Sequence, residues 1–186
     1  METREQILKR SFSTEFICKV RDTSDIIGAL DTTNEFIERM QNAIELSHYK
    51  YGWPSKTYPE LAIAWKCAEQ RIYKYRETHN LEYLVDVANF LMLEYMFPYN
   101  KEKAATYMDI YPSICDANDK YIDKCENLIN AYKESNDMNH LVCACSMVLF
   151  EYNVPMYMDA FYKSEDSDKS CGLAGGISYK QLMSEE

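Results

Sequence analysis

The stretch AEQRIYKYRETHNLEYLVDVANFLMLEYMFP, residues 68–98, recurs without a gap as CENLINAYKESNDMNHLVCACSMVLFEYNVP, residues 125–155. The two stretches are offset by 57 residues, and nine of their 31 aligned positions are identical. The identical pairs are Glu69/Glu126, Ile72/Ile129, Tyr75/Tyr132, Glu77/Glu134, Leu84/Leu141, Val85/Val142, Glu94/Glu151, Tyr95/Tyr152 and Pro98/Pro155. A repeat of this length indicates one duplicated supersecondary unit.

Each copy predicts a helical hairpin. Apolar residues recur every three or four positions on both sides of a short polar segment, which is RETHN at 76–80 and KESND at 133–137. This spacing is typical of helices that bury one face, and the polar segments hold residues that favour turns. Both helices of each hairpin are therefore expected to pack inward.

Prolines suggest where the hairpins begin and end. Pro59 is expected to open the first helix, whose buried face would start at Leu61, because a proline at the first helical position loses no hydrogen bond. Pro98 and Pro155 are expected to end the two hairpins, since proline removes a backbone donor and clashes with the preceding turn.

The composition favours helices throughout. The chain of 186 residues has only five glycines and five prolines, and three of the glycines lie within the last fifteen residues. We predict an all-α fold, a single helical domain of about six to eight helices containing the two tandem hairpins. The expected parts are N-terminal helices at 1–58, a first hairpin at 59–99, a linker helix with the second hairpin at 100–162, and a glycine-containing tail at 163–186.

The N-terminal part predicts three further helices. Two short ones are expected near residues 4–12 and 24–30. Thr32 and Glu35 form a capping-box pattern before a longer helix that runs toward the sequence KYGWP at 50–54.

Several kinds of site and location are disfavoured. The seven cysteines include no CxxC pair, which disfavours zinc, and the acidic tail lacks the later glutamate of an EF-hand calcium loop. The longest apolar run, at 141–150, is far shorter than the roughly 20 residues that span a bilayer. We therefore expect no membrane association and a location in the reducing cytoplasm of a bacterial host cell.

The charge is negative and uneven. The net charge is −10, which disfavours strong independent binding to nucleic acid. Residues 1–103 carry a balance of −2 and residues 104–186 a balance of −8. The second half therefore predicts a basic partner surface. The carboxylates expected to contact it are Asp109, Asp116, Asp119, Asp123, Asp166 and Asp168.

Polar residues also interrupt the apolar pattern of the first hairpin. Glu82, Asp86 and Asn89 fall on one side of a helix, but the second copy has Asn139, Cys143 and Ser146 there. We interpret them first as a polar strip bordering the core. Glu94 and Glu151 persist in both copies beside a tyrosine, which predicts a structural hydrogen bond repeated with the fold.

An enzymatic alternative uses some of the same acids. All-α nucleotide pyrophosphatases of the MazG kind hold Mg²⁺ with an ExxE on one helix and an acidic pair on another. This chain resembles them in offering Glu35 with Glu38, and Glu82 with Asp86. Such oxygen ligands suit Mg²⁺ and would bridge it to substrate phosphates. A non-catalytic assembly module is a third possibility.

Three blocks carry a resemblance at the family level: ERMQNAIELSHYKYGW at 38–53, LVDVANFLMLEYMFP at 84–98 and DSDKSCGLAGGISY at 166–179. They resemble a group of small proteins from phages and prophages of gut Firmicutes. Small acidic phage proteins without catalytic motifs are similar in kind to anti-CRISPR proteins that inhibit Cas9. The resemblance implies a non-enzymatic inhibitor without a cofactor, which binds Cas9 or its guide-RNA complex and blocks DNA cleavage.

Overall fold

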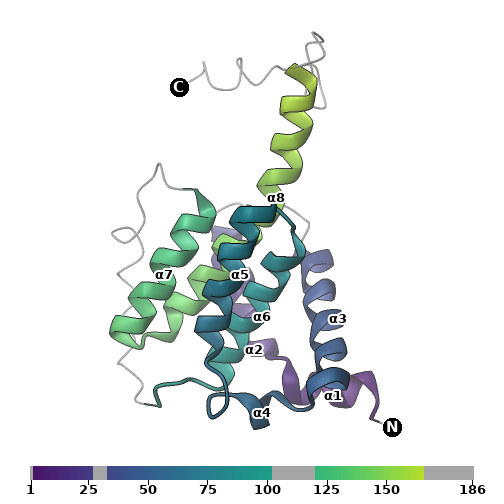
Figure 1. Cartoon of the computed structure of the whole chain (residues 1–186), viewed down its shortest axis with the longest axis vertical. Coiled ribbons are helices and arrows are strands. Elements are labelled where there is room, and N and C mark those ends of the chain that lie inside the picture. The colour runs from purple at the N-terminus through teal and green to yellow at the C-terminus, as the bar shows by residue number, and fades with distance from the viewer. Residues whose placement is uncertain (1, 27–32, 102–119, 166–186) are drawn as a thin grey trace. The chain divides into compact units, whose positions relative to one another are not determined.

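The computed structural model of the chain describes residues 2–26, 33–101 and 120–165, and these form eight helices and no strand (Figure 1). The prediction of an all-α fold is confirmed. Met1–Glu151 form one compact unit and Tyr152–Glu186 a second, in which the described residues continue the last helix. The helices are α1 (Arg4–Ser11), α2 (Thr14–Ile26), α3 (Thr33–Tyr51), α4 (Pro54–Thr57), α5 (Ala64–Thr78), α6 (Glu82–Met96), α7 (Tyr121–Ser135) and α8 (Met138–Glu165).

The two predicted hairpins are α5 with α6 and α7 with the first part of α8. Their turns have the same backbone: His79 at φ 53° and ψ 22°, and Asn136 at φ 55° and ψ 20°. Both residue types are enriched in this left-handed region. The N–H of His79 donates to the carbonyl of Tyr75, and that of Asn136 to the carbonyl of Tyr132, each at 2.7 Å. The duplicated sequence therefore forms the same turn twice.

The apolar faces that the periodicity predicts form the core. Ile72 and Ile129 have no exposed surface, and the second helix of each hairpin is buried along the expected stripe. Buried residues at matching positions are Leu84/Leu141, Val85/Val142, Ala88/Cys145, Leu91/Val148 and Met92/Leu149. Between α7 and α8, the rings of Tyr121 and Phe150 stack with centroids 5.1 Å apart.

The hairpins exchange two tyrosine–carboxylate hydrogen bonds. The hydroxyl of Tyr75 donates to Glu151 Oε1 at 2.8 Å, and the hydroxyl of Tyr132 donates to Glu94 Oε1 at 2.7 Å. The other oxygen of each glutamate accepts a backbone N–H from its own hairpin, Trp65 N at 3.4 Å for Glu94 and Ile122 N at 3.2 Å for Glu151. The predicted structural hydrogen bond is confirmed, but the donor comes from the other hairpin and not from the adjacent tyrosine.

Ion pairs at the same interface repeat the exchange. Arg76 contacts Glu126 at 2.8 Å, and Lys133 contacts Glu69 at 2.7 Å. When each residue is replaced by its equivalent in the other copy, 57 positions away, one ion pair becomes the other. The same holds for the two tyrosine–glutamate pairs. This is the signature of a two-fold relation between the hairpins, in which each surface contacts its own equivalent.

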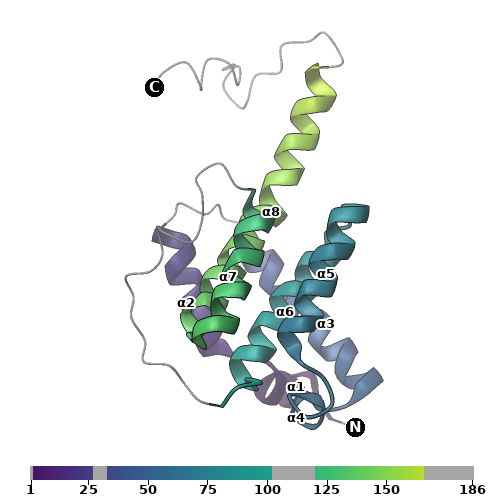
Figure 2. The same cartoon turned by 60° about the vertical axis from the view of Figure 1, so that its left-hand side comes forward.

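The N-terminal helices cover both hairpins in a related way. Asn89 Nδ2 on α6 donates to the carbonyl of Met40 on α3 at 3.1 Å. The hydroxyl of the equivalent residue on α8, Ser146, lies 3.2 Å from the Val142 carbonyl of its own helix and a longer 3.5 Å from the Val20 carbonyl on α2. Helix α1 packs on α3 (Figure 2). Between these helices Arg4 contacts Glu45 at 2.7 Å.

Local features differ from the sequence prediction. Helix α2 already begins at Thr14, because Phe16, Ile17 and Val20 give that stretch a buried face. Residues 24–26 of the helix expected at 24–30 form the end of α2, and residues 27–30 lie outside the described residues. Pro59 does not open a helix; it follows a cis peptide bond, and α5 begins at Ala64, which leaves Leu61 81% exposed.

At the other end of the repeat, α8 continues beyond Pro155 to Glu165. A helix can pass a proline when the cost is limited to one backbone hydrogen bond and a kink. The second hairpin therefore lacks the sharp end that the matching prolines predict. Among the helices in the described ranges, none is long and apolar enough to cross a membrane.

Candidate functional site

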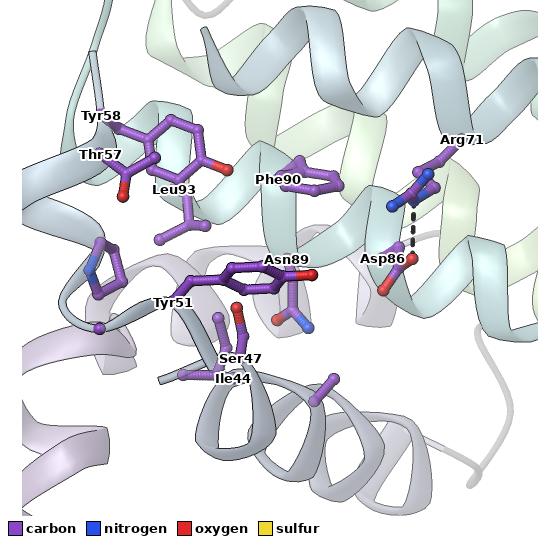
Figure 3. Close-up of a pocket in the computed structure, with 13 residues that line it drawn as sticks. Ile44, Ser47, Tyr51, Thr57, Tyr58, Arg71, Asp86, Asn89, Phe90 and Leu93 are labelled. Atoms are coloured by element: carbon purple, nitrogen blue, oxygen red, sulfur yellow. Dashed lines mark hydrogen bonds and ion pairs between the residues drawn. The ribbon is translucent and has the colours of Figure 1, made fainter. Parts of the chain in front are cut away.

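A pocket of about 440 Å³ lies where α3, α4, α5 and α6 converge (Figure 3). Ile44, Asn89 and Leu93 form its buried part, and Tyr51 and Ser47 lie at its exposed edge. In Figure 3, Tyr58 and Leu93 lie toward one end of the pocket, and Arg71 and Asp86 toward the other. The volume falls in the range of sites that hold small molecules, about 300–1,000 Å³.

Asn89 places an amide in the buried part of this pocket. The residue is only 6% exposed, and its Nδ2 is held by the Met40 carbonyl. Its Oδ1 is buried and has no hydrogen-bond partner among the residues that the structure describes. A buried acceptor without a donor costs about 1–3 kcal/mol, so such an atom is normally satisfied by water or a ligand.

Arg71 and Asp86 form an ion pair at one end of the pocket. Arg71 Nε and Asp86 Oδ2 are 2.8 Å apart, and both side chains are partly exposed. Burial raises the pKa of the Asp86 carboxyl above its usual value, although the nearby guanidinium acts in the opposite direction. The pair presents little net charge to the pocket.

Aromatic rings form much of the remaining wall. The rings of Tyr58 and Phe90 meet edge to face, with centroids 6.5 Å apart. Burial, and next the neighbouring Cys67, raise the pKa of Tyr58 to about 12, so its hydroxyl is neutral at physiological pH. Tyr51 is 70% exposed at the edge of the pocket. The pocket wall thus combines three aromatic rings with polar side chains and is close to neutral.

The residues of the magnesium alternative are not brought together as free ligands. Glu35 and Glu82 both contact Arg39, at 3.1 Å and 3.4 Å, and Glu38 is exposed on α3. Asp86 instead pairs with Arg71. In the described parts of the chain, no group of three or more His, Cys, Asp or Glu side chains is arranged to hold a metal ion.

Most of the predicted partner-binding acids cannot be placed. Asp109, Asp116, Asp119, Asp166 and Asp168 lie outside the described residues, as does the glycine-containing part of the tail. Asp123 lies in the first turn of α7 and contacts Arg76 of the first hairpin at 2.6 Å. That carboxylate contributes to the hairpin interface.

Sequence reasoning singled out Asp86 and Asn89 but missed the pocket they line. Its other walls come from α3, α4 and α5, and nothing in the local pattern of those segments indicates that they meet. The one available signal was the cluster of aromatic residues, glycine and prolines at 49–59, which is unusual in a chain with so few helix breakers.

Comparison of the chain with protein-family models, with curated proteins and with solved structures found no match.

Proposed function

We propose that this protein is a non-catalytic inhibitor that binds a basic surface of a bacterial defence nuclease, Cas9 or its guide-RNA complex, and blocks DNA cleavage in the host cytoplasm. The observation that carries the proposal is the charge balance of −8 in residues 104–186 against −2 in residues 1–103. Cas9 holds nucleic acid in positively charged channels, which an acidic protein can occupy or obstruct.

The placement of the described acids supports this proposal. Glu94 and Glu151 accept hydrogen bonds from tyrosines, and Glu69, Asp123 and Glu126 pair with cations across the hairpin interface. These carboxylates stabilise the fold. Residues 104–119, by contrast, include three aspartates and no lysine or arginine. The acidic surplus is therefore concentrated in sequence away from the acids that hold the hairpins together.

Two sets of substitutions with equal change in charge test the proposal. In the first, the five acids Asp109, Asp116, Asp119, Asp166 and Asp168 become Asn. In the control set, Glu5, Asp22, Glu38, Glu60 and Glu77, all exposed acids of the first half, become the corresponding amides. Both variants have a formal net charge of −5 in place of −10. Asp123 is left intact because it binds Arg76.

The assay is DNA cleavage by Cas9 loaded with guide RNA, titrated with the purified protein. We expect inhibition to saturate near one equivalent and to weaken with added salt, since the Debye length is about 8 Å at physiological ionic strength. The first set should weaken inhibition by about tenfold and the control set by less than about threefold, because placed charges steer association more than net charge does. Equal effects of the two sets would exclude this electrostatic mechanism, and absence of binding would exclude Cas9 as the target.

The enzymatic alternative has its own readout. A Mg²⁺-dependent pyrophosphatase would release pyrophosphate from nucleoside triphosphates, and Asp86→Asn would reduce that rate by orders of magnitude. We expect no turnover, because Arg39 and Arg71 neutralise carboxylates that such a site would need. Robust metal-dependent turnover would replace the inhibitor proposal.

A further inference from the structure

We propose that the pocket between α3 and the first hairpin binds a small, planar, uncharged aromatic molecule that donates an N–H to Asn89 Oδ1. This inference is independent of the proposed inhibition, because none of the acids expected to contact a nuclease lines the pocket. It rests on three observations: an unpaired acceptor in the buried part of the pocket, aromatic walls, and a comparison between the two hairpins.

Comparison of the two hairpins distinguishes the role of the Asn89 donor, Nδ2, from that of its acceptor, Oδ1. At the equivalent position Ser146 has only a hydroxyl, which lies 3.2 Å from the Val142 carbonyl of its own helix and 3.5 Å from the Val20 carbonyl of the covering helix. Asn89 makes the same kind of contact with the Met40 carbonyl but carries an additional acceptor, Oδ1. That acceptor is buried, lines the pocket and lacks a partner among the described residues. Packing between helices does not require it.

The walls indicate what approaches this acceptor. Figure 3 shows the rings of Tyr51 and Phe90 above the amide of Asn89, with Tyr58 at one end of the pocket. Flat rings favour a flat aromatic occupant, which gains stacking and edge-to-face contacts beyond the burial of its area. The ion pair of Arg71 with Asp86 leaves no excess charge to attract an anion or a cation. An uncharged aromatic ring with one N–H can pack against the aromatic side chains of the pocket and donate a hydrogen bond to Asn89 Oδ1.

A matched pair of probes tests the hydrogen bond. Indole has a single N–H and a flat fused ring, and 1-methylindole differs by replacement of that N–H hydrogen with a methyl group. Binding to the full chain can be measured by protein-observed NMR titration. For indole we expect a dissociation constant on the order of 0.1–1 mM, as is usual for a fragment of this size. For 1-methylindole we expect binding weaker by about tenfold, because Oδ1 stays unsatisfied when that ring is bound.

Substitutions on α3 test the location. Ser47 lines the pocket from its exposed edge, so Ser47→Trp should fill the space and weaken indole binding by more than about tenfold. The matched control is Leu46→Trp, which places the same side chain on the preceding residue, where the native leucine is exposed and does not line the pocket. The control should bind indole as the wild type does.

A third variant tests the acceptor itself. Asn89→Ser copies the residue of the second hairpin, retains a side-chain donor in its hydroxyl and removes Oδ1. It should bind indole and 1-methylindole equally. If Asn89→Ser does not fold, as judged by circular dichroism, the probe pair and the two tryptophan variants still decide the question.

Three results would overturn the inference. Absence of indole binding at millimolar concentration would mean that water alone satisfies Asn89. Equal affinity of the wild type for the two probes would exclude recognition of the N–H. Undiminished binding of indole to Ser47→Trp would place the interaction elsewhere on the protein.

Discussion

Tyr75 and Tyr132 occupy equivalent positions of the repeat, but removal of their hydroxyls should destabilise the protein by different amounts. Tyr132→Phe and Tyr75→Phe each delete a single oxygen and leave the ring in place, so neither creates a large cavity. The difference lies in the acceptors. Glu94 has no exposed surface, whereas Glu151 is partly exposed. Water can replace a lost donor at Glu151 but not at Glu94.

The magnitude follows from the remaining partners of each carboxylate. Without Tyr132, Glu94 retains the N–H of Tyr99 at 2.8 Å on Oε1 and that of Trp65 at a long 3.4 Å on Oε2. A hydrogen bond to a charged group contributes about 1.5–3 kcal/mol, and the full amount applies where the acceptor stays buried. We expect Tyr132→Phe to lower the free energy of unfolding by about 2–3 kcal/mol and Tyr75→Phe by about 1 kcal/mol.

Urea denaturation followed by circular dichroism measures both values, with the slope of the transition checked for constancy. A double-mutant cycle with Glu94→Gln isolates the pair and should give a coupling of about 1–2 kcal/mol with Tyr132→Phe, and a coupling near zero with Tyr75→Phe. The reasoning fails if Tyr132→Phe lies within about 0.5 kcal/mol of wild type, or if Tyr75→Phe is the more damaging change.

Two further predictions concern the core and its titratable groups. Ile72→Ala and Ile129→Ala should each lower the free energy of unfolding by about 2–5 kcal/mol in urea denaturation, because both side chains are fully buried; a loss near zero would contradict their placement. Alkaline pH should also destabilise the fold: burial, as the leading cause, raises the pKa of both Tyr58 and Cys145 to about 12 from ordinary values of 10.0 and 9.0. Because the unfolded chain loses these protons at lower pH than the folded protein, the free energy of unfolding should be constant up to about pH 9 and fall between pH 9 and 12. Denaturation measured at a series of pH values tests this, and an unchanged free energy across that range would refute the burial of these groups.

The duplicated hairpins were predictable because their signals are local and occur twice. Ile72 and Ile129 are buried as their helical spacing predicts, and Tyr75 and Tyr132 make equivalent contacts. Periodicity fixes which face of a helix turns inward without reference to what covers it. A second copy with the same period strengthens that inference.

The partners of the polar residues were not predictable in this way. The nearest tyrosine in sequence suggested a local bond for Glu94, but its donor is Tyr132, which lies 38 residues away in the chain. Asp86 and Asn89 were identified, yet the pocket around them depends on how α3 and α4 pack against α6. The prediction at Pro59 was wrong for a similar reason. Proline is favourable at the first position of a helix, but the local sequence does not reveal the cis peptide bond between Tyr58 and Pro59.

The exchanged contacts also bear on how the two copies have diverged. A single hairpin that carries both the tyrosine and the glutamate could pair with an identical molecule through these bonds, because each partner offers what the other needs. Fusion in one chain makes that pairing independent of protein concentration. Glu69, Tyr75 and Glu94 contact the second copy, and the equivalent residue of that copy is identical at each of these three positions. At Asn89 and Ser146 the copies contact different helices and carry different residues, and Asn89 lines the pocket. Within one chain the two copies can therefore differ where they do not contact each other, while the paired glutamates and tyrosines of the interface are identical.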